Sequence, residues 1–333
     1  MPIIKHCGDQ ICNQPEEPPG DVKSRNMPQP PTEHSSLITL PAPGTLALWL
    51  RDVLPGFGMI DWVGATGSTN ADLMQRARLQ ASRPSAMPWL LGAHRQTAGK
   101  GRAGRSWQSI EAAALMFSCA FETSIPMAQL PGLSPALGVA ACEALRAQCP
   151  GITDDRARRL GVKWPNDLQW GDAKLAGILV ETARQPGARG PVVIVGMGLN
   201  LTGAEALTEQ LARPIADWAR VCQGSRLSQG ADDTDDIRQT AGQLVACVAL
   251  AWQQALKDYS GQGYAGFQSR FDRVDALAGQ AVSVTDQGQL LQTGIAQGTD
   301  STGRLLLATD HGHSPILVGD VSVRMRTTHA TGL

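Results

Sequence analysis

Two apolar runs near the middle of the chain constrain the fold more than any other feature. Residues 174–182 (KLAGILVET) and 191–201 (PVVIVGMGLNL) are rich in aliphatic and β-branched side chains. Such runs, bounded by turn residues, are typical of buried strands. The segment ARQPGARG between them is short and contains glycine and proline, so it is a turn rather than a crossover. We therefore predict an antiparallel pair of strands in the core of a sheet.

Short apolar runs before this pair predict three further strands. They cover residues 60–63, 88–94 and 114–122, and the last run (ALMFSCAFE) includes both an aromatic and a cysteine. Runs of this length are too short for most helices and fit buried strands. We therefore expect a sheet that begins well before residue 174.

Three segments predict helices. Thr69 and Asp72 have the spacing of a capping box, which predicts a helix over about 70–79. Ser134 followed by Pro135 marks the start of a second helix. Apolar residues over 237–255 recur at helical spacing and predict a third, long helix. The buried stripe of the second helix is Leu137, Ala140, Ala141, Ala144 and Leu145, and that of the third is Ile237, Ala241, Leu244, Val248, Trp252 and Ala255.

Two segments predict irregular structure. Residues 162–168 (VKWPNDL) enter a turn, because Pro165 forbids continued helix and forces Trp164 to be extended. Residues 203–235 are mixed in composition and are predicted to be rich in loops, with an acidic run over 232–236 near their end.

From Ala281 onward the sequence consists of short apolar runs that alternate with turn residues. The short runs AVSV, LLQTGIA, RLLLA and ILVGDVSVRM are separated by DQGQ, TDSTG and DHGHS. Regularly spaced short strands with turn residues between them predict a small barrel of about 50 residues. We place a domain boundary near Leu277.

The two ends of the chain differ in composition from its centre. Residues 1–43 are rich in Pro, Glu, Gln and Ser and poor in aliphatic residues, so they cannot bury enough apolar surface to offset chain entropy and are predicted to be disordered. The predicted organisation is an extension over 1–43, a large domain over 44–277, a small domain over 278–326 and a tail over 327–333.

Composition excludes several classes of protein. The formal net charge is −1, which gives no reason to expect a nucleic-acid or membrane-surface binder. No apolar run approaches the length of a membrane span and no secretory signal is present, so a cytoplasmic location is expected. The seven cysteines contain no C-x-x-C pair, which indicates reduced thiols rather than a zinc site or a disulfide framework; they are Cys7, Cys12, Cys119, Cys142, Cys149, Cys222 and Cys247.

The segment QTAGKGRAGRSW, residues 96–107, holds two overlapping signals. Gly99, Gly101 and Gly104 spell G-x-G-x-x-G, the dinucleotide-binding pattern. That pattern requires a strand that ends at the first glycine and a helix that starts at the last. Residues 94–98 stand between the apolar part of the predicted strand and Gly99, the first glycine of the pattern. Arg-Ser-Trp, rather than the start of a helix, follows Gly104, the last glycine. The dinucleotide interpretation therefore fails, and no P-loop pattern occurs either.

The cations of this loop carry more information than its glycines. Lys100, Arg102 and Arg105 could simply be solvated on an exposed loop. However, a loop with three glycines is costly to order, so such a loop is most useful when a ligand orders it. A polyanion could do so through charge-assisted bonds from arginine, and Trp107 could anchor the end of the loop to the core.

Three shorter motifs each admit a structural and a functional interpretation. In GSTN, Ser68 or Thr69 could only cap a helix, or could join a polar pocket for a neutral, amide-like ligand. KWPND could be a plain turn, or Asp167 could be a carboxylate beside a nucleotide or an amine. In KLAGILVE, Lys174 is a lysine in an apolar strand, where it needs an anionic partner or solvent, and Gly177 indicates a close approach to the backbone.

Together with GMGLN at 196–200, these motifs occur in the order found in the biotin–protein ligases, and the chain resembles that family over about residues 45–326. The resemblance implies an α+β fold with a central mixed sheet and helices, related to the class II aminoacyl-tRNA synthetases, followed by an SH3-like barrel. It assigns 44–277 to a catalytic domain that binds biotin and ATP. The implied reaction forms biotinyl-5′-adenylate from biotin and Mg²⁺-bound ATP and then transfers biotin to a lysine of a biotin carrier domain of a carboxylase.

The resemblance also implies the site residues. Ser68, Thr69, Asn70 and Gln96 match residues near the ureido head of biotin. Lys174, Arg102 and Asp167 match catalytic positions, and Asp167 is a candidate contact for Mg²⁺. The remaining matches to biotin- or adenylate-binding positions are Gly99, Lys100, Gly101, Gly104, Arg105, Trp107, Asn166, Gly177 and Asn200.

One residue departs from the family pattern, and the resemblance does not assign one further role. Lys100 stands where the family more often has arginine, which removes a planar two-pronged donor. Trp218 is a candidate by position for the aromatic that covers adenine. A homodimer is compatible with the resemblance, and no nucleic-acid or membrane partner is expected.

Two alternatives remain at this stage. Some biotin ligases are also biotin-responsive repressors with an N-terminal helix-turn-helix, but the residues before Thr45 show no helical period. A lipoate or octanoate transferase of the same fold is the second alternative. Those enzymes usually lack both the loop rich in glycine and arginine and the C-terminal small domain.

Overall fold

The computed structural model describes residues 40–79, 86–149, 154–184, 190–222, 233–318 and 321–325. The predicted tail and nearly all of the predicted disordered extension lie outside the described residues. Leu40 is buried in the main core, and helix α1 (Pro43–Val53) begins one residue before the predicted start of the large domain at residue 44. The carbonyl of Pro41 accepts a hydrogen bond of 2.9 Å from His94 Nε2, which fixes this entry to the fold.

A mixed sheet of seven strands forms the centre of the larger domain, in the order β1-β2-β3-β7-β6-β5-β4. The pair β1–β2 is parallel and every other neighbouring pair is antiparallel. The predicted antiparallel pair of apolar runs is confirmed as β6 and β7. The strands are β1 (Met59–Thr66), β2 (Trp89–Gln96), β3 (Ala114–Glu122), β4 (Leu160–Lys163), β5 (Asp167–Trp170), β6 (Ala173–Ala183) and β7 (Val192–Asn200).

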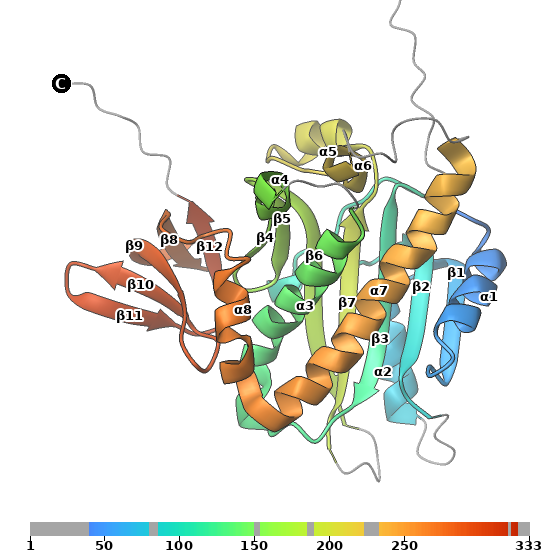
Figure 1. Cartoon of the computed structure of the whole chain (residues 1–333), viewed down its shortest axis with the longest axis horizontal. Coiled ribbons are helices and arrows are strands. Elements are labelled where there is room, and N and C mark those ends of the chain that lie inside the picture. Colours follow the sequence, from blue (N-terminus) through green and yellow to red (C-terminus); the bar gives the residue numbers. More distant parts are fainter. Residues whose placement is uncertain are drawn as a thin grey trace, which may run out of the picture. The chain divides into compact units, whose positions relative to one another are not determined.

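Helices cover both faces of this sheet (Figure 1). The helices α1, α3 (Leu133–Ala147) and α7 (Asp233–Gln262) lie on one face and enclose the main hydrophobic core. Helix α2 (Thr69–Leu79) packs on the other face over a smaller core around Leu73, Trp89 and Ile194. Among the described residues, no helix combines the length and apolar character needed to cross a membrane.

Short elements connect these layers. The 3₁₀ helices are η1 (Arg102–Gly104), η2 (Met127–Gly132) and η4 (Gly263–Phe267). The short α-helices are α4 (Asp154–Arg159), α5 (Ala204–Leu211), α6 (Trp218–Cys222) and α8 (Gln268–Asp272). The prediction that 203–235 is rich in loops is wrong for α5 and α6. Their apolar residues, such as Leu207 and Val221, are buried, and this packing rather than periodicity makes them helical.

The capping box predicted from Thr69 and Asp72 is also wrong. Helix α2 already includes Thr69, and the preceding Ser68 Oγ accepts a 3.5 Å hydrogen bond from the Ala71 amide. The Asp72 carboxylate instead accepts a hydrogen bond from the Thr66 hydroxyl. Thr69 is therefore free to turn its hydroxyl toward β3.

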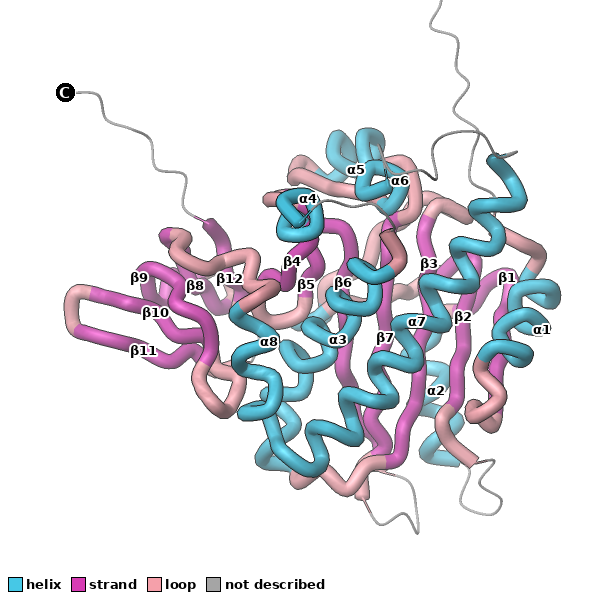
Figure 2. The backbone as a smooth tube through the Cα atoms, viewed as in Figure 1, coloured by secondary structure: helices cyan, strands magenta, loops and turns pink. Residues whose placement is uncertain are grey.

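A second sheet forms the C-terminal domain, as Figure 2 shows. All its neighbouring strands are antiparallel, in the order β11-β10-β9-β8-β12. The sequence predicts a small barrel here; within the described residues no pairing joins β11 to β12, so a closed barrel is not seen. The strands are β8 (Ala281–Asp286), β9 (Gln289–Thr299), β10 (Leu305–Thr309), β11 (Gly312–Ile316) and β12 (Ser322–Met325).

The two sheets are joined by specific contacts. Residues 274–276 pair with Val162 of β4, whose amide donates to the Val274 carbonyl at 2.7 Å. The Trp164 indole donates a buried hydrogen bond of 3.0 Å to the Gly303 carbonyl in the turn between β9 and β10. The second sheet is thus attached directly to the turn that carries the KWPND motif.

Candidate functional site

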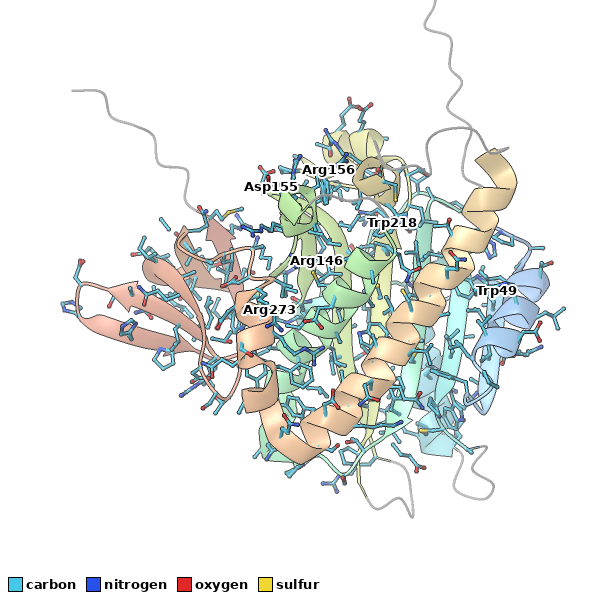
Figure 3. All side chains as sticks on the ribbon, in the orientation of Figure 1. Trp49, Arg146, Asp155, Arg156, Trp218 and Arg273 are labelled. Carbon is cyan, nitrogen blue, oxygen red and sulfur yellow. The ribbon has the colours of Figure 1, made fainter. Side chains whose placement is uncertain are left out.

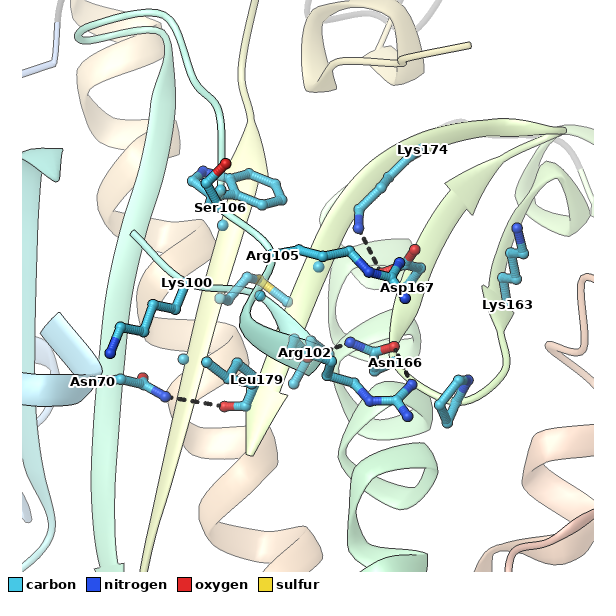
Figure 4. Close-up of a pocket in the computed structure, with 18 of the residues that line it drawn as sticks. Asn70, Lys100, Arg102, Arg105, Ser106, Lys163, Asn166, Asp167, Lys174 and Leu179 are labelled. Carbon is cyan, nitrogen blue, oxygen red and sulfur yellow. Dashed lines mark hydrogen bonds and ion pairs between the residues drawn. The ribbon is translucent and has the colours of Figure 1, made fainter. Parts of the chain in front are cut away.

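A cavity of about 540 Å³ opens above one end of β6 and β7 (Figure 4). The start of α2, the end of β2, the loop over 97–107 and the turn between β4 and β5 surround it. Segments far apart in the sequence therefore meet at one place. Thirteen residues predicted from the sequence line this cavity: Ser68, Thr69, Asn70, Gln96, Lys100, Gly101, Arg102, Arg105, Trp107, Asn166, Asp167, Lys174 and Gly177.

The loop rich in glycine and arginine folds back on itself as a compact turn. The amide of Gly101 donates to the carbonyl of Arg105 at 2.6 Å, and the amide of Trp107 donates to the carbonyl of Gly99 at 2.9 Å. At the tip, Gly104 has a φ of 69°, a conformation that glycine adopts without a steric penalty. These backbone bonds hold the segment that brings Lys100 and Arg102 to the cavity, which both residues line.

Trp107 holds the end of the loop against the sheet. A Cβ at Gly198 would lie only 2.3 Å from the Trp107 indole, and a Cβ at Gly177 would lie 3.3 Å from it. Both glycines therefore make the space that the ring occupies. This explains the predicted close approach at Gly177 and confirms the predicted anchoring role of Trp107.

A half-buried ion pair lies at the far side of the cavity. Lys174 Nζ is 2.7 Å from Asp167 Oδ1, and only 17% and 26% of the two side chains are exposed. The carboxylate of Asp167 is thus the anionic partner that a lysine in an apolar strand requires. Lys174 also lies 5.7 Å from the centre of the Trp107 ring.

Further cations collect near this pair. Arg102 donates a 3.2 Å hydrogen bond to Asn166 Oδ1, and Asn166 in turn donates a 2.7 Å bond to the Ile178 carbonyl. Burial lowers the pKa of Lys163, the nearby Asp167 carboxylate opposes that shift, and the cations Lys174, Arg324 and Arg213 add to it. This end of the cavity is therefore rich in positive charge and suited to an anionic ligand.

Uncharged polar groups form the opposite end of the cavity. Gln96 Oε1 accepts a 2.8 Å bond from the Thr69 amide, and the Thr69 hydroxyl lies 2.6 Å from Ser118 Oγ. Ser118 is fully buried, and Ser68, Thr69 and Asn70 are at most 5% exposed. Such an arrangement fits a neutral ligand group that both donates and accepts hydrogen bonds.

Comparison with known proteins identifies the family. Residues 68–200 match the model described as the biotin/lipoate A/B protein ligase family, and residues 278–324 match that of the biotin protein ligase C terminal domain. The biotin–[acetyl-CoA-carboxylase] ligase of Mycobacterium tuberculosis is 32% identical over 277 residues, which cover 82% of this chain and 93% of that protein. The chain belongs to the biotin protein ligase family.

Other members agree with this assignment. The ligase of Paracoccus denitrificans is 29% identical over 77% of this chain and 97% of its own length. The bifunctional ligase/repressor BirA of Escherichia coli is 33% identical over 69% of this chain, but only 64% of its own length is matched. The biotin protein ligase of Aquifex aeolicus, solved in complex with biotin and ATP, has 26% identity and a TM-score of 0.59, covering 80% of this chain and 99% of that one.

Three of the residues predicted from the ligase family do not line the cavity. Gly99 and Gly104 shape the backbone of the loop. Asn200 is 3% exposed at the end of β7 and donates a 3.1 Å bond to the Ala216 carbonyl. Trp218, the candidate for covering adenine, is 4% exposed in α6 and packs in the main core (Figure 3). Asn200 and Trp218 are thus close to the site in sequence, but the Asn200 amide bonds to a backbone carbonyl and the Trp218 ring packs in the core.

Sequence analysis missed several residues that line the cavity. Lys163 belongs to the quoted KWPND motif and its charge was a usable signal. Ser118 is a polar residue within a run that is otherwise almost entirely apolar, and this was a weaker signal than the charge of Lys163. Arg213, Ser322 and Arg324 had no local signal, because long-range folding alone brings them to the site; the Arg105 guanidinium donates to Ser322 Oγ across 217 residues.

Proposed function

We propose that this chain is an ATP-dependent biotin–protein ligase. It would activate biotin as biotinyl-5′-adenylate and then transfer biotin to one lysine of a biotin carrier domain of a carboxylase. The observation that carries the proposal is the convergence of all the short motifs on one cavity with a neutral polar end and a cationic end. A neutral urea ring and a polyphosphate need these two environments side by side.

The two ends of the cavity divide the substrates between them. Ser68, Thr69 and Gln96 supply hydrogen-bonding groups for the ureido head of biotin. Lys100, Arg102 and Arg105 lie on the loop that would close over the adenylate, where their charges meet the phosphate. The valeryl chain of biotin would run between them, over the glycine-rich surface of β6 and β7 at Gly177 and Gly198.

The first step joins two anions. A carboxylate oxygen of biotin attacks the α-phosphorus of ATP, the bond from the α-phosphorus to the bridging oxygen breaks, and pyrophosphate leaves. The transition state gathers negative charge between the two reactants, so the site must place fixed positive charge there. Lys174 and Arg102 supply it, and the Asp167 carboxylate holds the Lys174 ammonium in position.

The cavity has one carboxylate suited to a divalent cation. Magnesium commonly binds through one or two carboxylates together with substrate phosphates and water. Asp167 lines the cavity, whereas the described residues contain no cluster of three metal-ligating side chains. The residues therefore fit a Mg²⁺ that arrives with ATP and touches Asp167. When bound, it would neutralise phosphate charge.

The second step transfers the activated group. The uncharged ε-amine of a carrier lysine attacks the acyl carbon, the bond from that carbon to the phosphate oxygen breaks, AMP leaves and the amine loses a proton. The adenylate must be shielded from water until the carrier arrives. The compact loop over 97–107, anchored by Trp107, provides that cover.

The proposal also covers the domain organisation, the location and the assembly, which we infer from the resemblance to the family. The five antiparallel strands of the C-terminal sheet support an SH3-like topology for 278–326, after a catalytic domain over 44–277. A cytoplasmic location fits a carboxylase carrier as substrate. A homodimer is part of the proposal only as the common assembly of proteins of this kind.

One reaction tests the proposed function. The protein is incubated with biotin, Mg-ATP and a biotin carrier domain, and the carrier is analysed by mass spectrometry. We expect one biotinyl group on one lysine, and none when biotin or ATP is omitted. Absence of the biotinyl group, or attachment of lipoate or octanoate in its place, would overturn the proposal.

A further inference from the structure

A continuous line of side chains runs from the neutral end of the cavity to a carboxylate beyond it. Glu181 Oε2 accepts a 2.9 Å hydrogen bond from Asn70 Nδ2, and Asn70 Oδ1 accepts a 2.6 Å bond from Ser118 Oγ. Ser118 Oγ lies 2.6 Å from Thr69 Oγ1. Thr69 lines the cavity, whereas Glu181 is half-buried on β6 and does not. Thus Glu181 is connected to the ligand side of Thr69 through two buried side chains.

The orientation of the Asn70 amide is fixed by its neighbours. Its Nδ2 faces two oxygens that can only accept, the Glu181 carboxylate at 2.9 Å and the Leu179 carbonyl at 3.4 Å (Figure 4). The opposite orientation would point the amide oxygen at both of them. Asn70 therefore presents its carbonyl oxygen, an acceptor, to Ser118.

The direction of the remaining protons follows from this orientation. Ser118 has one hydroxyl proton and must donate it to Asn70 Oδ1. The short contact between Ser118 and Thr69 then needs its proton from Thr69. Gln96 Oε1 lies farther from the Thr69 hydroxyl, at 3.2 Å, and already accepts a 2.8 Å bond from the Thr69 amide, so the 2.6 Å contact with Ser118 takes the hydroxyl proton. Consequently, the Thr69 hydroxyl has no proton left for a ligand and offers only lone pairs to the cavity.

We propose that Glu181 is a positioning residue that sets this polarity, so that Thr69 accepts a hydrogen bond from an N–H of the ligand. The inference rests on the proposed function, in which that N–H belongs to the ureido ring of biotin. Ser68 complements Thr69, because its oxygen accepts from the Ala71 amide and its own proton stays available for a carbonyl. A urea presents N–H and C=O side by side and matches this pair.

The backbone at Gly196 lies directly against the relay. A Cβ at Gly196 would lie 2.2 Å from Asn70 Oδ1 and 3.1 Å from Ser118 Oγ. Gly196 pairs with Ser118 in the sheet, so the relay depends on that register. Because these groups are linked by hydrogen bonds in one short chain, we expect a change at the carboxylate to reach the Thr69 hydroxyl.

The affinity for biotin tests the carboxylate. Glu181→Leu removes the charged acceptor, and we expect the dissociation constant for biotin, measured by calorimetry, to rise about tenfold. Glu181→Gln keeps an oxygen for Asn70 and should stay within about threefold of the wild type. The affinity for ATP reports that the variants are folded and should change less than about twofold. Glu122→Leu, the same replacement at an exposed residue on β3, is the matched control and should leave biotin binding unchanged.

Biotin analogues test the polarity itself. In the two oxazolidinone analogues, a ring oxygen replaces one or the other ureido N–H. In the wild type, one analogue would set an oxygen against the Thr69 oxygen and bind about 100-fold more weakly than biotin. In Ser118→Ala the Thr69 hydroxyl loses its acceptor and can donate its proton to the ligand. The ratio of the affinities for biotin and for this analogue should therefore shrink at least about tenfold.

The outcomes separate the inference from the function. Biotin binding by the wild type with equal affinities for Glu181→Leu and Glu181→Gln, or with unchanged analogue discrimination in Ser118→Ala, would overturn the role of Glu181 alone. A wild-type protein that binds no biotin would overturn both the inference and the proposed function.

Discussion

The two ends of the cavity are built in different ways. The neutral end consists of residues on regular elements, Thr69 on α2 and Ser118 on β3, which are almost fully buried and held by short hydrogen bonds. The cationic end combines Lys163 on β4 and Lys174 on β6 with cations from less regular places, namely Arg102 and Arg105 from a loop and Arg324 from the C-terminal sheet. From this difference we expect a urea to meet a preformed pattern of hydroxyls, whereas the phosphates would meet charges that come partly from a loop and partly from the C-terminal sheet.

The largest expected effect falls on the cationic end. Lys174→Ala removes the ammonium between the two reacting anions and leaves Asp167 without its partner. We expect adenylate formation, followed by pyrophosphate release, to slow by about 100- to 1000-fold while biotin affinity stays within about threefold. An unchanged rate of pyrophosphate release would contradict the role of Lys174. Lys174→Met, which keeps the aliphatic stem, controls for lost packing.

A second variant tests the segment that closes the cavity. Arg102→Gly removes the bond to Asn166 and one phosphate-side charge. We expect biotinyl-adenylate to leave the enzyme about tenfold or more faster and to label protein lysines without selectivity. The measurement is the release of radiolabelled adenylate from a preloaded enzyme. Retention for as long as in the wild type would refute the proposal, and Arg184→Gly, at an exposed position, serves as the control.

The neutral end should tolerate less change in shape. A Cβ at Gly196 would collide with Asn70 Oδ1, so Gly196→Ala should weaken biotin binding about tenfold or more and spare ATP binding. Gly64→Ala on β1, where a Cβ has open space, is the matched control. Equal affinity of both variants for biotin would argue against a rigid urea pocket.

The pH dependence of ATP binding sharpens the comparison. Burial and neighbouring cations lower the pKa of Lys163 from its ordinary value of 10.5. Lys163 is charged below its lowered pKa, so ATP affinity should fall at a lower alkaline pH than an ordinary lysine would give. In Lys163→Arg the fall should move to higher pH, since arginine stays protonated. Superimposable pH profiles, measured by calorimetry from neutral pH upward, would exclude Lys163 from the phosphate site.

The smallest expected effect concerns the contact with the C-terminal sheet. Arg105 donates to Ser322 at an exposed position, and exposed hydrogen bonds contribute little. Ser322→Ala should raise the Michaelis constant for ATP no more than about threefold. A larger change, measured in steady-state assays, would mean that the C-terminal sheet holds the loop more firmly than this contact implies.

The sequence predicts the core sheet well, because local patterns determine it. The apolar run at 114–122 coincides with β3 (Ala114–Glu122), and the two central runs pair as expected. The short helix α5 escaped prediction since tertiary packing rather than periodicity stabilises it. Turn residues mark four short runs in the C-terminal part, but β11 (Gly312–Ile316) overlaps the predicted turn DHGHS and was missed. How the sheet curves depends on long-range contacts that no local pattern shows.

For the cavity, prediction succeeded where a motif carries its chemistry locally. Thr69, Lys174 and the loop arginines belong to short motifs that keep their chemistry together. Arg324 could not be foreseen, because its approach depends on how two sheets are joined through Trp164 and Gly303. Asn200 was misplaced for the reverse reason, since its motif is adjacent to the site but its amide turns to the Ala216 carbonyl.

The central claim is that one cavity joins biotin to ATP, and pyrophosphate exchange tests it most directly. Labelled pyrophosphate is supplied to the enzyme with ATP, in the presence and absence of biotin and with no carrier protein. The account predicts that label enters ATP only when biotin is present, and that Lys174→Ala loses the exchange. Exchange without biotin, or no exchange with it in a protein that binds both substrates, would contradict the account.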